Sequence, residues 1–155
     1  MDGEKISAIV KGVLEELSRE RMTLSLAGKI SAAVKEKARE MGVNAVVAVS
    51  NAAARPVLVE CMDDSFIASF DVALKKAYTV VALKMSTAEL KPLANPGGSL
   101  YGIQFTNDNS IVVFGGGDPL MKGGRIIGGL GVSGGTEEQD TALSAYGRKF
   151  FESII

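Results

Sequence analysis

The first 19 residues carry apolar side chains at spacings of three and four, with charged side chains on the other face. The apolar positions are Ile6, Ile9, Val10, Val13, Leu14 and Leu17. Such spacing predicts an amphipathic helix with one apolar stripe. Polar residues 18–21 follow, so the pattern favours an appended helix and linker over residues 1–20 and a domain over residues 21–155. The stripe would pack on that domain, pack on a sister subunit, or dock onto another protein.

A second helix is expected to begin after Thr23 or Ser25, because either side chain can accept a hydrogen bond from a first-turn amide. Gly42 is suited to the left-handed position that ends a helix. Two runs rich in β-branched residues follow, at 45–50 and 57–61, and a segment of turn length separates them. They predict an antiparallel hairpin.

Three further helices are indicated by an apolar arc and by two capping boxes. In a capping box, a Ser or Thr and the Glu or Gln three residues later each accept from the other's backbone amide. The pairs here are Ser86 with Glu89 and Thr136 with Gln139. The predicted bounds are Asp64 or Ser65 to about Met85, Ser86 to about Pro92, and Thr136 to about Ser153.

Three more strands are expected, at residues 103–105, 111–114 and 125–132. The segment 107–109 supplies a turn between the first two, since Asn and Asp tolerate left-handed backbone conformations. Together with the earlier hairpin, these strands would form a five-stranded, mainly antiparallel sheet. The order of elements indicates an α+β domain with helices flanking the sheet.

Composition narrows the classes of function. At 155 residues, with 46% hydrophobic and 23% charged residues, the chain suits one globular domain. A net charge of -1 argues against nucleic-acid binding, and no apolar run approaches the roughly 20 residues of a membrane span. The single cysteine, Cys61, and the lack of a signal-peptide pattern predict a cytoplasmic location. Histidine is absent, which removes the commonest metal ligand and general base.

Glycine is concentrated late in the chain, with 13 of the 18 glycines between Gly97 and Gly135. Residues 129–134 fit the dinucleotide fingerprint GxGxxG, but that motif requires a βαβ unit, and the 20 residues after Gly135 cannot supply one. Glycines in a strand instead allow a bend, or the close approach of a backbone or a flat ligand. The run Gly115, Gly116, Gly117 predicts either an anion-binding nest, a bulge or a subunit contact.

Several short motifs together resemble the GlcG/HbpS-like family, which includes the carboxy-terminal domain of PduO-type proteins from propanediol-utilisation operons. The resemblance covers about 130 residues, from Met22 to the end. Its motifs are Met62-Asp63, Asp71 with Lys75-Lys76-Ala77, Pro96-Gly97, Leu100-Tyr101-Gly102, Gly115-Gly116-Gly117-Asp118-Pro119, Ile127 to Gly135, and Glu138-Gln139-Asp140. The resemblance implies a profilin-like fold of α/β/α layers, homo-oligomers, and binding or slow degradation of haem.

Any haem here must be held without histidine, by Tyr, Cys, Met or a weaker oxygen ligand. The candidates are Tyr78, Tyr101, Cys61, Met62 and Met85, each of which also suits core packing. We expect Tyr101 to be the best axial ligand, because it lies on a loop rich in Gly and Pro.

Charged residues suggest how a ligand would be oriented. Asp71 and Lys75 are four apart on the long helix and form either an ordinary ion pair or a carboxylate site. Asp140 complements the dipole of the last helix and ties down the preceding turn. The predicted groove lies between the long helix and the glycine-rich loops. Its expected ligand-binding residues are Asp71, Lys75, Tyr78, Pro96, Gly97, Tyr101, Gly115, Gly116, Gly117, Gly134 and Asp140.

The leading hypothesis is a small haem- or tetrapyrrole-binding accessory protein of a propanediol- or corrinoid-linked pathway. An alternative is a homo-oligomeric scaffold or microcompartment cargo protein without haem, because residues 1–19 resemble the short helices that deliver cargo to microcompartment shells. A location in the microcompartment lumen would follow. A third hypothesis is an enzyme that degrades haem or acts on a small carbonyl compound, although no general acid or base stands out.

Overall fold

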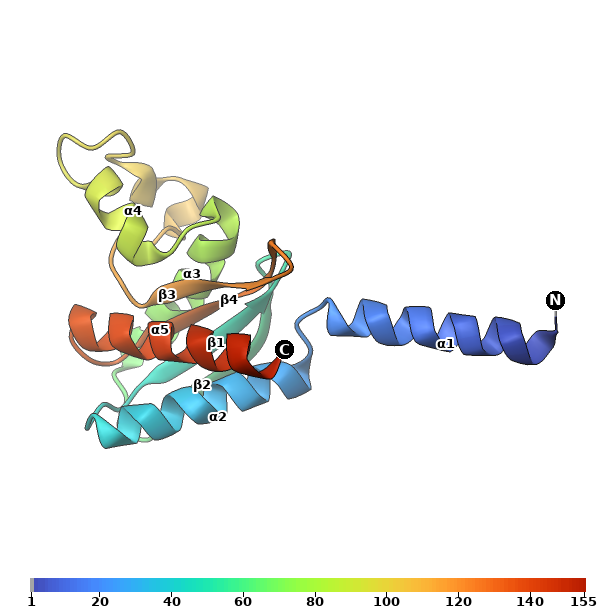
Figure 1. Cartoon of the computed structure of the whole chain (residues 1–155). Coiled ribbons are helices and arrows are strands. Elements are labelled where there is room, and N and C mark those ends of the chain that lie inside the picture. Colours follow the sequence, from blue (N-terminus) through green and yellow to red (C-terminus); the bar gives the residue numbers. More distant parts are fainter. Residues whose placement is uncertain (1) are drawn as a thin grey trace.

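The computed structural model describes residues 2–155, and its elements form an α/β/α sandwich preceded by one separate helix (Figure 1). The sheet has four antiparallel strands in the order β2-β1-β4-β3. The elements are α1 (Gly3–Arg19), α2 (Leu24–Glu40), β1 (Val46–Asn51), β2 (Pro56–Cys61), α3 (Ile67–Leu83), α4 (Thr87–Ala94), β3 (Gly117–Lys122), β4 (Arg125–Ser133) and α5 (Glu137–Ile154).

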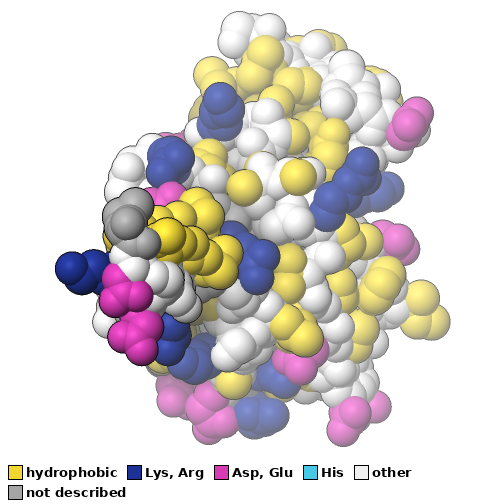
Figure 2. Space-filling view, turned by 90° about the vertical axis from the view of Figure 1, so that its right-hand side faces the viewer, with side chains coloured by type: hydrophobic (Ala, Val, Ile, Leu, Met, Phe, Trp, Pro, Cys, Tyr) yellow, Lys and Arg dark blue, Asp and Glu magenta, His cyan; other side chains and the backbone are white. Residues whose placement is uncertain are grey.

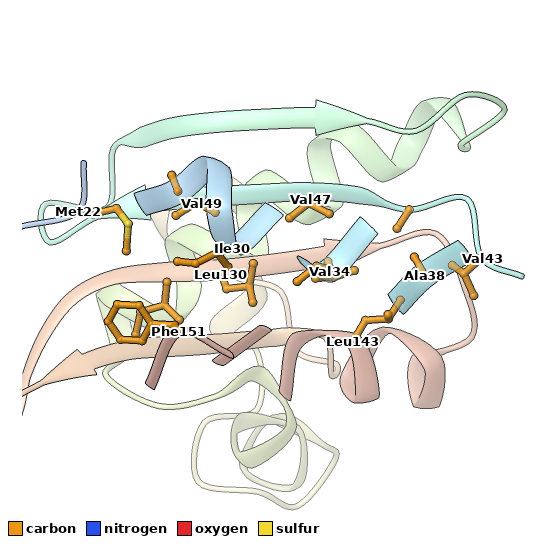
Figure 3. Packing of buried hydrophobic residues seen from close by; sticks show 14 of the residues in the cluster. Met22, Ile30, Val34, Ala38, Val43, Val47, Val49, Leu130, Leu143 and Phe151 are labelled. Atoms are coloured by element: carbon orange, nitrogen blue, oxygen red, sulfur yellow. The ribbon is translucent and has the colours of Figure 1, made fainter. Parts of the chain in front are cut away.

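Helices α2 and α5 cover one face of the sheet, and their apolar side chains meet those of β1 and β4 (Figure 3). The residues between these layers are fully buried and include Ile30, Val34, Leu143 and Phe151. Alternate residues of β1 point to this face, so Val47 and Val49 join the cluster while their neighbours pack against α3. This period of two fixes which side of the sheet each strand residue occupies.

Helix α3 covers the other face, and glycines of β4 let it come unusually close. A side chain at Gly129 or Gly131 would collide with the backbone of α3 at Ala77 and Ala73. Small residues thus face each other across this layer. The glycine fingerprint of residues 129–134 lies mostly in an antiparallel strand, where it serves helix packing and belongs to no βαβ unit.

The predicted caps are confirmed. Thr23 Oγ1 accepts from the Leu26 amide, and both capping boxes are formed. Gly42 has φ +68° after α2. The long helix is shorter than expected, because a turn from Met62 to Ser65 delays its start and Lys84, with a left-handed φ of +57°, ends it. Helix α4 runs two residues past Pro92.

The prediction of five strands was wrong, since the sheet has four. Residues 103–105 form a 3-10 turn after Gly102, whose φ is +92°. Residues 111–114 lie outside the sheet, where Ile111 packs in a satellite cluster beneath α4 and the Val112 amide donates to Thr79 Oγ1. The strand that was missed, β3, contains Pro119, which is tolerated because β3 is an edge strand.

Helix α1 stands apart from the sandwich and points away from it (Figure 1). All six residues of its apolar stripe are exposed, between 45% for Ile6 and 60% for Leu14. An ion pair from Glu20 to Arg125, at 3.0 Å, joins the following linker to the β3–β4 hairpin. The stripe is therefore not part of the core of the sandwich.

Candidate functional site

A buried ion pair lies at the centre of the predicted site, and its cation is Lys76. The Lys76 side chain is fully buried beneath α3. Its Nζ donates to Asp140 Oδ2 at 2.9 Å and to the Val132 carbonyl at 2.8 Å, and it lies 4.9 Å from the centroid of the Phe114 ring. This ammonium group ties α3 to β4 and α5.

The glycine run and Asp140 are brought together around that ammonium group. A side chain at Gly116, whose φ is +111°, would place its Cβ 2.5 Å from Lys76 Nζ, so only glycine fits there. The Gly115 amide donates to Glu137 Oε1, and the Gly117 amide donates to Thr87 Oγ1. These two amides thus bind groups of the protein itself.

Burial has the largest effect on the pKa of Lys76 at this centre. Removal from water lowers the pKa of Lys76, and the nearby carboxylate of Asp140 opposes that shift. The other oxygen of Asp140 accepts from the Gly135 amide at 2.9 Å, as expected for a carboxylate that ties down the Gly134–Gly135 turn. Lys91 and the Gly115 amide lower the pKa of Glu137. The centre is closed, and its polar groups satisfy one another.

The sequence analysis missed the role of Lys76, although a signal was available. Lys76 shares a helical face with Ala73, Ala77 and Val80, all of which are buried against the sheet. A lysine on an otherwise apolar face predicts a buried, paired cation. Its neighbour Lys75, which the sequence analysis proposed as a carboxylate-binding residue, lies on a different face of α3.

Lys75 and Tyr78 line a separate cavity of about 220 Å³ beside the β1–β2 turn. Asp71 is exposed, and no ion pair joins it to Lys75 in the described part of the chain. The Tyr78 hydroxyl accepts from Asn107 Nδ2 at 3.2 Å. These predicted residues thus contribute to a cavity that is distinct from the centre around Lys76.

Pro96, Gly97 and Tyr101 lie in the loop after α4 and are not among the residues that line the Lys75 cavity. Pro96 and Gly97 are exposed, and Gly97 has φ +87°. The Tyr101 side chain is 63% exposed. This loop therefore presents Tyr101 to solvent without forming a groove with the glycine run.

A hollow of about 400 Å³ lies at the other end of the β1–β2 hairpin, where β2 ends. Two cations, two carboxylates, a thiol, a thioether and an amide line it: Lys35, Arg39, Asp63, Asp64, Cys61, Met62 and Asn44. The Cys61 thiol is free and exposed, whereas Met62 Sδ accepts from the Ala45 amide at 3.3 Å. Lys35 Nζ pairs with Glu60 at 2.7 Å, and that contact and Ser31 lower the pKa of Glu60.

The thiol and the two cations of this hollow suit a haem, whereas Asp63 and Asp64 place negative charge beside them. An accessible cysteine can supply a thiolate ligand to haem iron. Lys35 pairs with Glu60, and Arg39 pairs with Glu36 at 2.8 Å, so the haem carboxylates would have to share or replace these acidic partners. Phe66, Ile67 and Phe70 follow along the chain and are exposed, but they are not among the residues that line this hollow. No group of three or more acidic or cysteine side chains suited to a bare metal ion occurs within residues 2–155. No helix in the same range is long and apolar enough to cross a membrane.

Comparison with known proteins gives a consistent result. A family model described as "Haem degrading protein HbpS-like" matches residues 22–149. A 15.0 kDa Citrobacter freundii protein, encoded in the dhaT-dhaS intergenic region, is 46% identical over 123 residues, which are 79% of this chain and 87% of that protein. The corrinoid adenosyltransferase PduO of Salmonella typhimurium is 39% identical over 116 residues, which are 75% of this chain and 34% of PduO.

The chain thus spans about a third of PduO. A solved structure, the crystal structure of a PduOC:heme complex, superposes with a TM-score of 0.80 at 34% sequence identity. The superposition covers 83% of this chain and 94% of that one. The α/β/α sandwich is therefore shared with a protein that has been crystallised with haem.

Proposed function

The chain belongs to the HbpS-like family, and from this premise we propose that it is a haem- or tetrapyrrole-binding accessory protein of a propanediol- or corrinoid-linked pathway. The observation that carries the proposal is the hollow at the end of β2, where an exposed thiol adjoins two cations. The relative that was crystallised with haem supports the ligand class. The PduO relatives support the pathway.

Three residues have distinct roles in this proposal. Cys61 would hold the haem iron through its thiolate, and Lys35 and Arg39 would pair with the ligand's carboxylates. Haem bound there would supply a redox-active iron, while the protein orients the ring and limits its exposure to water. Tyr101, the ligand expected from sequence, stays a prediction. Its side chain is exposed and does not line the hollow at Cys61, so we favour Cys61.

The test is a titration of the purified protein with hemin, followed by absorbance at the Soret band. Wild type should saturate near one haem per chain, and Cys61→Ser should lose the shifted spectrum while Tyr101→Phe keeps it. Lys35→Met and Arg39→Met should weaken binding and leave the spectrum unchanged. Loss in the Tyr101 variant alone would restore the sequence prediction, and weak, unsaturable uptake by wild type would remove haem from the function. Slow bleaching of the band after a reductant is added would instead favour haem degradation.

A second candidate function, a homo-oligomeric scaffold or microcompartment cargo protein, is favoured by α1. Viewed along that helix, hydrophobic side chains gather on one side and charged ones on the other (Figure 2). An exposed stripe of this kind suits docking into a groove of a partner such as a shell protein. Deletion of residues 1–19 should abolish co-purification with shells, whereas unchanged co-purification would contradict this function. Light scattering of the same two proteins measures the subunit number.

A further inference from the structure

The cavity beside Lys75 has its own position in the fold and is independent of the proposed haem hollow. It lies where β1 ends and β2 begins, and Ser50 and Pro56 form part of its wall. The haem hollow lies at Cys61, the other end of β2. Five residue steps of about 3.3 Å separate Pro56 from Cys61, so the two spaces are about 16 Å apart along the strand.

The inner wall of this cavity is apolar. Ala54, Pro56 and Leu74 contribute hydrocarbon surface. The nearby Ser50 hydroxyl donates to the Ala77 carbonyl at 3.1 Å, so that polar group is already satisfied within the protein. A ligand must therefore present an aliphatic body to this wall, because a polar group placed there would lose its hydration without gaining a partner.

The rim of the cavity carries donors instead of acceptors. The half-buried Lys75 side chain has no hydrogen-bond or ion-pair partner within residues 2–155. The Tyr78 oxygen accepts from Asn107, which leaves the hydroxyl proton available for donation. Ser110 also lines the cavity. Its backbone carbonyl accepts a hydrogen bond from the Thr79 hydroxyl. Lys75 and Tyr78, a cation and a hydroxyl donor, therefore line the same small space.

We propose that this cavity binds a carboxylate carried on a short aliphatic body. Lys75 and the Tyr78 hydroxyl hold the two oxygens through charge-assisted hydrogen bonds, and the apolar wall covers the chain. The volume of about 220 Å³ is below the range typical of drug-sized ligands, so it suits a body of only a few carbon atoms. The carboxylate belongs either to a free short-chain acid or to an acidic side arm of a larger ligand.

The experiment is a titration with butyrate, followed by amide chemical shifts and calorimetry, with 1-butanol as a neutral ligand of the same chain length. Butyrate should bind saturably and perturb residues of the cavity, and butanol should bind at least about tenfold more weakly. Lys75→Met should lower butyrate affinity about tenfold or more, as expected when one charge-assisted bond is lost. The matched control, Lys29→Met on the exposed side of α2, should leave the affinity unchanged.

Three results would overturn the proposal: no saturable binding of butyrate, equal affinity for butanol, or full affinity in Lys75→Met. Hemin added to the butyrate-saturated protein distinguishes the two sources of carboxylate. Independent binding identifies a free acid as the ligand, and competition identifies an acidic side arm of the tetrapyrrole. Cys61→Ser should retain butyrate binding, so failure of the haem proposal and failure of this one remain separate outcomes.

Discussion

Lys75 and Lys76 are neighbours on α3, yet they belong to two different kinds of region. Lys76 is fully buried, and its ammonium group contacts Asp140, the Val132 carbonyl and the Phe114 ring. Lys75 is half-buried at the rim of a cavity and has no partner in the described residues. One step along a helix turns a side chain by about 100°, so adjacent identical residues face different environments. One lysine stabilises the fold, and the other is available to a ligand.

The buried region around Lys76 is sensitive to substitution, because each of its polar groups is satisfied only by the others. A buried ammonium group is costly unless a carboxylate and hydrogen-bond acceptors replace water. Close packing of α3 on β4 brings Lys76 within reach of Asp140. The rim of the cavity at Lys75 lacks this dependence, so substitutions there should cost much less stability than substitutions around Lys76.

The largest effect is expected from Asp140→Ala, which leaves the Lys76 charge buried and unpaired. We expect a loss of about 3–5 kcal/mol in the free energy of unfolding, measured by urea denaturation. Asp71→Ala is the control, because Asp71 is exposed on α3, the helix of Lys76, and should change stability by less than about 0.5 kcal/mol. Equal losses in both variants would mean that the buried pair does not stabilise the fold.

A second prediction concerns the close approach that makes the pair possible. The Cβ of Gly131→Ala would lie 2.7 Å from the Ala77 amide nitrogen and would collide with the Ala73 carbonyl. Overpacking of this kind should cost about 1–3 kcal/mol. Gly28→Ala in α2 meets nothing within 4 Å and should stabilise the protein by about 0.5–1 kcal/mol. A neutral Gly131→Ala would show that α3 can move away from β4 without loss.

A third prediction uses the lowered pKa of Lys76. Burial holds that pKa below 10.5 in the folded protein, so between the two values the unfolded chain binds more protons. The free energy of unfolding should therefore gain a component that rises with pH in this alkaline window. Lys76→Met lacks the ammonium group and should lack that component. The measurement is the difference between wild type and variant in urea unfolding from pH 8 to pH 10.5, and a constant difference would contradict the prediction.

The contrast also explains what the sequence revealed. Caps, the first hairpin and the layered α+β fold were predictable, because local side chains such as Thr23, Ser86 and Thr136 determine them. The missing fifth strand was not, since Ile111 is apolar but its partners are residues of a satellite cluster beneath α4. A local apolar pattern predicts that a segment is buried, but it does not predict which part of the fold buries it.

The candidate site divides in the same way. Asp140 and the glycine run were both expected to bind a ligand, and the structure brings Asp140 and Gly116 beside the Lys76 ammonium group. Their binding of a ligand stays a prediction. The burial of Lys76 was not predicted, because lysine side chains are rarely fully buried. The hollow at Cys61 depends on the meeting of α2 with the end of β2, which no local spacing records.

The smallest effect on stability is expected at Lys75, and it separates the roles of Lys75 and Lys76 most directly. Lys75→Met removes a charge that has no partner in the described residues and keeps the hydrocarbon stem, so the free energy of unfolding should change by less than about 0.5 kcal/mol. Lys76→Met, the same substitution one residue along, leaves Asp140 buried without its cation and should cost about 3–5 kcal/mol. Both values come from urea unfolding at pH 7. Similar costs for the two variants would show that Lys75 has a structural partner, and the cavity would then lose its free ammonium group.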